Sequence, residues 1–469
     1  MSRVFEALVK AGQEKKRQEE GLNADIEHVV EVAVPNNSDR ANLEWQVGEN
    51  GKANNNGHRG LPPNIPAVKS WRERIEELLF GWDLRRYANF PLVALEKDSA
   101  ASEQYKILRE QCPVGWSDLY GGFYVVTSYE NVFAVGEDWS TFSSAQGMTL
   151  PDINPLMRFI PIDYDPPAQQ KYRHVLLPHL SSKAVGLLEV QIRDFVQSII
   201  AELRSSDSCD LVAELASPVP MYAICLILGV PLEDQEMFKA WAHRMAHPGD
   251  NQENGVTAAM ELMTYILGMV DARRSEPRDD LISHLLRVDF DGRPLTDDEI
   301  VSMGFLLLPA GFDTTESALG AIFHLLGTQP WLREQFAAVE NIGDAVEEFL
   351  RLVSPVQCTS RVATQESAIG GVQIEPGQRV LIVFGAANRD EKEFPKSEDT
   401  ILDRHPNRHL AFGAGVHRCV GAHLARLEIK IVLEEILRGL PPFRVPNEDA
   451  VVWHTGHIRG VARLPVEFE

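Results

Sequence analysis

The residues most able to carry chemistry gather around one cysteine, in the stretch HLAFGAGVHRCVGAHLAR over residues 409–426. Gly413 and Gly415 precede the cysteine and let the backbone turn sharply and approach a flat partner closely. Helical periodicity begins at Cys419 itself. The pattern therefore predicts a sulfur at a helix N-terminus, where free N–H groups and the helix dipole lower the pKa of a thiol below about 8.5.

A thiolate held in this way has three possible roles. A buried cysteine that only caps its helix needs no partner. A nucleophile needs a base, and His417, two residues before Cys419, could serve only if the turn folds it back. A metal ligand needs a metal that binds sulfur. The residue types alone leave these three roles open.

The remaining cysteines do not extend this site. The chain contains five, at positions 112, 209, 225, 358 and 419, and none belongs to a CxxC pair. This scatter argues against both a disulfide framework and a structural zinc site. Any cysteine chemistry is therefore that of a single thiol.

Charge and hydropathy limit the possible partners and the compartment. The 469 residues carry 45 basic and 68 acidic side chains, a net charge of −23, which does not suit binding to nucleic acid. Apolar runs such as residues 305–308 are too short to span a bilayer, and the first 20 residues lack a signal-peptide core. We therefore expect a soluble, cytoplasmic protein without a membrane span.

A long buried helix is expected in the middle of the chain. Thr296 and Glu299 form a capping-box pattern, and residues 300–326 are apolar nearly all round, ending before Gly327. The centre of this segment, LLLPAGFDTTES, contains Pro309, Gly311 and polar residues where a buried helix is usually uniform. These residues predict a kink and a polar groove.

The other elements indicate the fold class and the domains. Residues 121–135 predict an alternating strand followed by a helix, and residues 368–384 predict two strands around a Pro376–Gly377 turn. Most remaining segments have helical periodicity, so we expect a mainly α fold with small β-sheets. Residues 1–70 are rich in turn formers and predict an extension, disordered or with a docking helix, ahead of a catalytic domain over 71–469.

The cysteine stretch fits the pattern F-x-x-G-x-H-x-C-x-G and closely resembles the haem-ligand signature of the cytochrome P-450 family, the haem-thiolate monooxygenases. The resemblance is to the soluble bacterial type and extends from about Cys112 to the C-terminus. It implies the fold of that family, with the long central helix over the haem. It also implies that Cys419 ligates the iron of haem b, with Phe412, Gly413 and Gly421 beside the ring.

Two further sets of residues follow from the resemblance. Asp313 and Thr314 in AGFDTT resemble the acid-alcohol pair of the family, which delivers protons on the oxygen-binding face. The haem propionates need cations and donors, and the family positions of these fall on Arg173, Arg361 and His417. Gln169 stands where many members have histidine, so it offers a hydrogen bond but no charge.

A structural motif also matches the family. Glu348 and Arg351 form an E-x-x-R pair on one helical face, and they resemble the buried pair that an arginine ahead of the cysteine loop completes, here Arg404. Alone, such a pair is a weak signal, because most are exposed ion pairs. The implied role is to brace the loop that presents Cys419.

The resemblance implies a monooxygenase that hydroxylates a small or medium hydrophobic molecule, such as a terpenoid or an aromatic compound, with O2. No flavin-binding or iron–sulfur cysteine pattern occurs, so electrons are expected from a separate ferredoxin or flavodoxin with its reductase. A peroxygenase is one alternative, which the intact Asp313–Thr314 pair disfavours. A haem-thiolate sensor or binding protein without turnover is another.

Overall fold

The computed structural model describes residues 98–117, 119–150, 158–246, 252–454 and 456–469. The chain divides into two compact units, residues 1–68 and 69–469, and every described residue belongs to the second. The extension predicted over residues 1–70 therefore lies outside the described residues.

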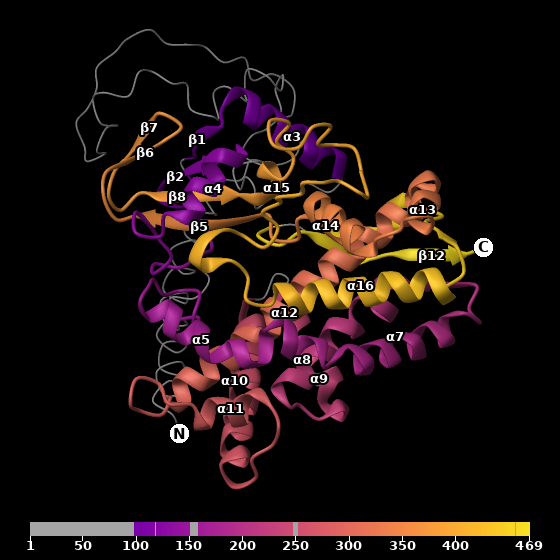
Figure 1. Ribbon diagram of the computed structural model, residues 1–469, viewed down its shortest axis with the longest axis horizontal. Helices are drawn as coiled ribbons and strands as arrows, with labels where there is room; N and C mark the ends of the chain where they lie inside the picture. The colour runs from indigo at the N-terminus through magenta and orange to yellow at the C-terminus, as the bar shows by residue number, and fades with distance from the viewer. Residues whose placement is uncertain (1–97, 118, 151–157, 247–251, 455) are drawn as a thin grey trace, which may run out of the picture. The chain divides into compact units, whose positions relative to one another are not determined.

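Helices dominate the described part of the chain (Figure 1). The α-helices are α3 (Asp98–Gln111), α4 (Tyr129–Glu137), α5 (Ala168–Leu180), α6 (Ser182–Gly186), α7 (Glu189–Leu203), α8 (Pro218–Leu228), α9 (Gln235–Ala246), α10 (Gln252–Ser275), α11 (Leu281–Arg287), α12 (Asp297–Thr328), α13 (Pro330–Ala337), α14 (Ile342–Val353), α15 (Phe384–Ala387) and α16 (Ala422–Gly439). The predicted mainly α fold is confirmed.

The strands form four small sheets. They are β1 (Val114–Ser117), β2 (Phe123–Val126), β3 (Phe142–Ser143), β4 (Ser208–Asp210), β5 (Cys358–Ala363), β6 (Ser367–Ile369), β7 (Val372–Ile374), β8 (Arg379–Val383), β9 (Phe443–Arg444), β10 (Val452–His454), β11 (Gly460–Arg463) and β12 (Pro465–Phe468). The largest sheet has the order β1-β2-β8-β5-β3, in which only β2 and β8 run parallel. The others are β10-β11, β4-β12-β9 and β6-β7.

One of the strand predictions needs correction. Strand β2 was expected to alternate, but all four of its residues are buried, because its two faces pack into two different hydrophobic clusters. Strand β7 is followed by the expected turn and by β8, and it pairs with β6. The hairpin closes at Gly370 and Gly371, which both have positive φ and so suit a tight turn.

The long central helix is α12, which runs through 32 residues. Its predicted capping box is present: Thr296 N–H donates to Glu299 Oε2 at 2.7 Å, and Glu299 N–H donates to Thr296 Oγ1 at 3.2 Å. Pro309 lies inside the helix, which continues through it as one element. Because proline has no N–H, the carbonyl one turn earlier lacks its usual helical donor.

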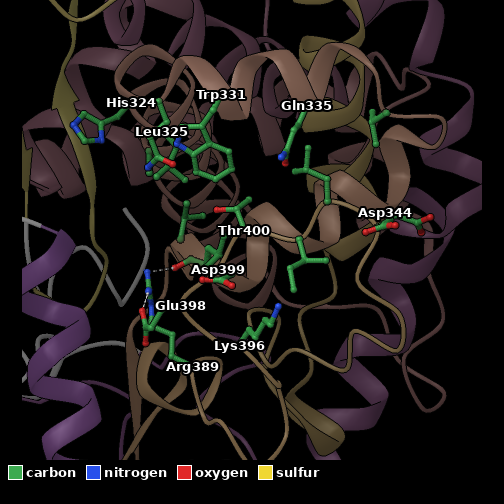
Figure 2. Close-up of a pocket in the computed structure, with 18 of the residues that line it drawn as sticks. His324, Leu325, Trp331, Gln335, Asp344, Arg389, Lys396, Glu398, Asp399 and Thr400 are labelled. Carbon is green, nitrogen blue, oxygen red and sulfur yellow. Dashed lines mark hydrogen bonds and ion pairs between the residues drawn. The ribbon is translucent and has the colours of Figure 1, made fainter.

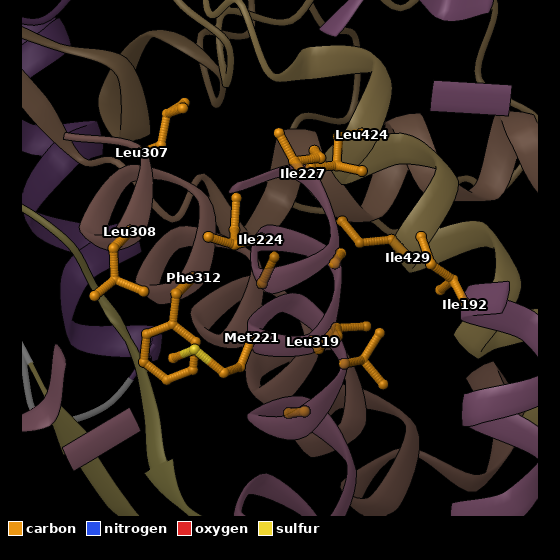
Figure 3. Packing of buried hydrophobic residues seen from close by; sticks show 14 of the residues in the cluster. Ile192, Met221, Ile224, Ile227, Leu307, Leu308, Phe312, Leu319, Leu424 and Ile429 are labelled. Atoms are coloured by element: carbon orange, nitrogen blue, oxygen red, sulfur yellow. The ribbon is translucent and has the colours of Figure 1, made fainter. Parts of the chain in front are cut away.

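Helices α7, α8, α12 and α16 enclose the main core (Figure 3). Ile224 of α8 meets α12 at Gly311, where an added Cβ would stand 2.3 Å from Ile224 Cδ1. The glycine in the middle of α12 therefore allows the two helices to approach closely. None of the helices in the described part of the chain combines the length and apolarity needed to cross a bilayer.

Candidate active site

A folded loop presents Cys419 just ahead of α16. The Cys419 N–H donates to Phe412 O at 2.8 Å and closes the loop on itself, and residues 415–417 form a short 3-10 turn. Helix α16 begins at Ala422, so the prediction that the helix starts at the cysteine was wrong by three residues. The reason is that Arg418 has extended backbone angles and the Cys419 N–H bonds back to Phe412. The backbone at the cysteine is therefore not yet helical.

The glycines of the loop are required by its geometry. Gly413 and Gly415 have φ values of 69° and 65°, in the left-handed region that favours glycine. A Cβ at Gly415 would also lie 2.4 Å from the carbonyl oxygen of Gly136. The loop can therefore pack against the C-terminal part of α4 only without a side chain at position 415.

The Cys419 thiol opens onto a cavity, although its surroundings oppose ionisation. Burial raises its pKa, while the Gly421 N–H and the positive charge of Arg173 lower it by less. The expectation of a lowered pKa was wrong, because the cost of removing the thiolate from water exceeds the gain from nearby N–H groups. A bound metal cation would reverse this balance, since a coordinating thiol loses its proton.

Three basic side chains line one part of the same cavity: Arg173 of α5, Arg361 of β5 and His417 of the loop. Burial lowers the pKa of Arg361 to about 10, and its Nη1 donates only to neutral oxygens of Thr359 and Ser360. Burial and the charge of Arg361 lower the pKa of His417 to about 4.

Among the described residues, Asp165 is the carboxylate whose charge acts on Arg361 and His417, and it is weakly engaged with them. Asp165 Oδ1 lies 3.9 Å from His417 Nε2, and Asp165 also accepts hydrogen bonds from Ser143 Oγ and the Ser144 N–H. Within the described ranges, neither Arg173 nor Arg361 forms an ion pair closer than 4 Å. The two arginines therefore make this part of the cavity suitable for an anionic group.

Helix α12 forms another wall of the cavity at the predicted acid-alcohol pair. Thr314 lines the cavity, and its hydroxyl donates to the Ala310 carbonyl at 2.8 Å, as a threonine in a helix commonly does. Asp313 precedes Thr314 on the helix and does not line the cavity. Burial alone raises the pKa of Asp313 to about 6.

Glu348 forms a buried cluster with two arginines. Arg351 donates to both carboxylate oxygens of Glu348, at 2.8 and 2.9 Å, and Arg404 Nε donates to Glu348 Oε2 at 2.9 Å. Glu348 and Arg351 have no exposed surface. The structure thus brings Arg404, which precedes the cysteine loop, onto the face of α14 that carries the E-x-x-R pair.

Comparison with known proteins agrees with this arrangement. The profile described as Cytochrome P450 matches residues 334–449. Cytochrome P450 130 of Mycobacterium tuberculosis is 35% identical over 361 residues, which cover 73% of this chain and 88% of that protein. The chain belongs to the cytochrome P450 family. It is therefore a monooxygenase of the haem-thiolate class, and the predicted resemblance is confirmed.

Other P450s are similar over comparable lengths. The mycinamicin IV hydroxylase/epoxidase of Micromonospora griseorubida is 33% identical over 353 residues, which cover 73% of this chain and 89% of that enzyme. The solved structure of CYP109E1 from Bacillus megaterium in complex with testosterone has a TM-score of 0.71 and 29% identity. That match covers 80% of this chain and all of the other.

The cavity of this P450 fits a haem. Its single thiol suits an axial iron ligand, and its buried cations suit two propionates. In the part of the chain that the structure describes, no group of three or more His, Cys, Asp or Glu side chains could hold a metal ion. An iron ion bound to Cys419 would therefore have to bring its other ligands with it, as the iron of haem does.

Three further residues of this P450 are held by contacts at or beneath the cysteine loop. Gln169 Nε2 donates to the Val416 carbonyl at 2.7 Å, so its donor group braces the cysteine loop. Arg426, which follows the loop on α16, is held by Glu347 at 2.6 and 2.8 Å. His409 also contacts Glu347, at 3.0 Å, and thus packs beneath the loop.

Two titratable residues, Glu428 and Glu316, were missed. Glu428 of α16 is fully buried, and burial raises its pKa well above the usual value, which the Thr315 hydroxyl opposes only in part. Burial raises the pKa of Glu316 to about 7. His457 lines the cavity near the C-terminus. Glu428 could have been noticed, since it interrupts the apolar stripe of Leu424 and Val432 on one helical face.

The cavity walls come from several separate segments of the chain. They include residues of 144–149 and 159–163, Ile224 of α8, α12 from Leu306, and Pro355, Val356 and Thr359. A separate groove between α13 and the loop 396–403 is lined by many charged side chains, and its Arg389 is already paired with Glu398 (Figure 2).

Proposed function

We propose that this P450 uses haem b to hydroxylate a small or medium hydrophobic molecule with O2 and electrons from a separate ferredoxin or flavodoxin with its reductase. One observation carries the proposal: a single cavity joins the Cys419 thiol, the basic cluster and the Thr314 face of α12 to largely apolar walls. Such a cavity can hold a charged, flat cofactor and an apolar substrate together.

The residues that would hold the haem are those around the cysteine loop. Cys419 would ligate the iron, and Arg173, Arg361 and His417 would neutralise or bond the propionates. Phe412, Gly413 and Gly421 would lie beside the ring, with Gln169 supporting the loop. When bound through a thiolate, haem supplies the oxygen chemistry, in which the sulfur favours O–O cleavage.

Asp313 and Thr314 would move protons toward the cavity. Thr314 stands at the cavity wall, where its hydroxyl can orient a water molecule, and Asp313 directly precedes it on the helix. A carboxyl group with a pKa of about 6 can both release and regain a proton near neutral pH. Burial raises the pKa of Glu316, one turn further, to about 7, so two groups of α12 can hold protons there.

The face around Arg418 would receive the electron donor. Arg418 directly precedes Cys419 and is exposed, and it forms no ion pair with any described residue. Arg426 is occupied by Glu347, which leaves Arg418 as the more available of the two arginines. An exposed cation one residue from the sulfur suits an acidic ferredoxin or flavodoxin.

The substrate would be a terpenoid or an aromatic compound, and the relatives widen this range to larger apolar molecules. One similar enzyme is named for mycinamicin IV, and one similar structure holds testosterone. The apolar residues of the cavity, such as Leu306, Met303 and Ile224, can contact any of these carbon skeletons.

The carbon monoxide difference spectrum of the reduced holoprotein tests the assignment. We expect the red-shifted band of thiolate ligation, and its loss in Cys419→Ser. Serine keeps the size of the side chain but removes the sulfur, whereas Cys225→Ser in the core of α8 should retain the band. A wild-type band without the red shift would exclude Cys419 as ligand.

Measurements of turnover distinguish a monooxygenase from a peroxygenase and from a sensor or carrier. With a ferredoxin and its reductase, NADPH and O2 should be consumed in step with hydroxylated product when a substrate is present. Equal turnover with hydrogen peroxide alone would identify a peroxygenase. Binding without coupled consumption for every ligand would identify a sensor or carrier.

A further inference from the structure

One polar side chain in the cavity wall is used neither by the haem-binding cluster nor by the acid-alcohol pair. His457 lines the cavity beside Ile458, Val356 and other apolar residues. Its place is set by the backbone: the Gln357 N–H donates to the His457 carbonyl at 2.9 Å, and Val356 pairs with Ile458 as a β-bridge. The imidazole is therefore attached to a rigid part of the wall.

Among the described residues, the imidazole has one hydrogen-bonding partner. His457 Nδ1 lies 3.9 Å from the Sγ of Cys358, which is completely buried in β5. Burial lowers the pKa of His457 to about 4 and raises that of Cys358, so at neutral pH the ring is neutral and the sulfur carries its proton. The Cys358 S–H has no other hydrogen-bond partner among the described residues.

The contact favours one position for the hydrogen of the ring. Either the S–H donates to Nδ1 or an Nδ1–H donates to the sulfur. A ring nitrogen accepts more strongly than a thiol sulfur, so the first arrangement is favoured, and it places the single N–H of the neutral imidazole at Nε2. Within the described part of the chain, Nε2 forms no hydrogen bond. A donor left without an acceptor in an apolar wall is unfavourable, and a ligand that supplies the acceptor relieves this cost.

We propose that His457 is a specificity-determining residue, which donates a hydrogen bond from Nε2 to an acceptor oxygen of the substrate. The substrate is then an apolar molecule that carries a carbonyl, ether or hydroxyl oxygen. This oxygen would lie at the end of the cavity next to the hairpin of β10 and β11. Molecules of the same shape without oxygen would bind more weakly. This inference rests on the proposed function, because it places the substrate in the same cavity.

Calorimetric titration of the haem-loaded full chain with matched pairs of ligands tests the inference. The pairs are adamantanone with adamantane and cyclododecanone with cyclododecane, which differ only in the carbonyl group. The wild type should bind each ketone about tenfold more tightly than its hydrocarbon, the ratio expected for one well-placed hydrogen bond in an apolar site. Equal affinity for both members of each pair would overturn the proposal.

Variants distinguish a hydrogen bond from a change of shape. His457→Phe keeps a ring of similar size, so it should bind the hydrocarbons as before and lose the preference for ketones. His457→Gln offers an N–H at similar reach and should restore part of the preference. Cys358→Ala frees Nδ1 from its donor and should reduce the preference, since the ring can then carry its hydrogen on either nitrogen.

A histidine on the same hairpin provides the control. His454 bonds to Ser317 of α12 at 2.9 Å and does not line the cavity, so His454→Phe should keep the ketone preference of the wild type. A ketone preference that survives in His457→Phe would contradict the proposal. Binding is read without turnover, so failure here leaves the carbon monoxide spectrum and the proposed function untouched.

Discussion

Arg404 donates from Nε to Oε2 of Glu348 at 2.9 Å, across 56 positions of the sequence. The contact joins the segment ahead of the cysteine loop to α14, and the Ile401 N–H adds a further bond to Glu348 Oε1 at 2.9 Å. The carboxylate is therefore the point at which the loop segment is attached to the helical core.

Removal of this carboxylate should be strongly destabilising. Glu348→Ala leaves Arg351 and Arg404 buried without their counter-charge, which costs about 3–5 kcal/mol. Urea unfolding of the variant measures this loss. Lys171→Ala breaks an exposed ion pair with Asp291 and should change stability by less than about 1 kcal/mol. A Glu348→Ala protein as stable as this control would show that the cluster does not brace the loop.

An alanine at Gly415 should displace the cysteine loop. The residue has positive φ, and its Cβ would collide with the Gly136 carbonyl, so we expect a loss of about 2–3 kcal/mol and weaker retention of haem. Gly371→Ala shares the positive φ but has open space around it, and should cost about 1 kcal/mol. Thermal unfolding and the haem content after purification check both variants. Equal losses would mean that the backbone angle alone matters.

Replacement of Arg361 should separate cofactor binding from folding. Arg361→Gln removes a buried cation, so the haem-free chain should be at least as stable as the wild type while haem is lost about tenfold faster. Transfer of haem to apomyoglobin measures the second effect. Arg379→Gln changes the neighbouring strand, where the arginine bonds to Ser360 Oγ and Gln146 O, and should leave haem transfer unchanged. An unchanged rate of haem transfer in Arg361→Gln would show that Arg361 does not bind a propionate.

The pH dependence of stability should reflect Asp313. Its pKa is about 3.9 in an unfolded chain and about 6 in the fold, so the folded state binds the proton more tightly. Stability should therefore fall as the pH rises from about 4 to about 6, by at most about 3 kcal/mol. Asp313→Asn should remove this part of the fall, and it should also lower the pKa of Glu316, which the charge of Asp313 raises.

Urea unfolding of the holoprotein at pH 4, 6 and 8 measures the effect. Glu202→Gln changes an exposed carboxylate of α7 and should follow the wild-type profile. A profile of Asp313→Asn that matches the wild type would indicate that the Asp313 carboxyl is solvated in the folded protein.

Local patterns predicted a large part of this protein. The capping box and the apolar run specify α12, because both depend on residues that are neighbours along one helix. The sequence also indicates the apolar face of α14, because its apolar residues recur at helical spacing. These residues are all buried in the structure: Val346, Phe349, Leu350 and Val353. The glycines of the cysteine loop marked a turn, and both adopt positive φ.

Other features depended on contacts between distant segments. The start of α16 was displaced because Cys419 bonds back to Phe412, and β2 does not alternate because both of its faces are covered by hydrophobic clusters. The direction of the Cys419 pKa follows from burial, which no local pattern encodes.

The sequence by itself determined the family, the thiol, and the helices whose residues interact within a few turns. Only the tertiary structure decided which charges are paired: Arg426 is held by Glu347, whereas Arg361 stays without a counter-ion among the described residues. It also decided that His457 faces a cavity beside Cys358. Pairing and burial arise where distant segments meet, and both depend on the distances and solvent exclusion that packing creates.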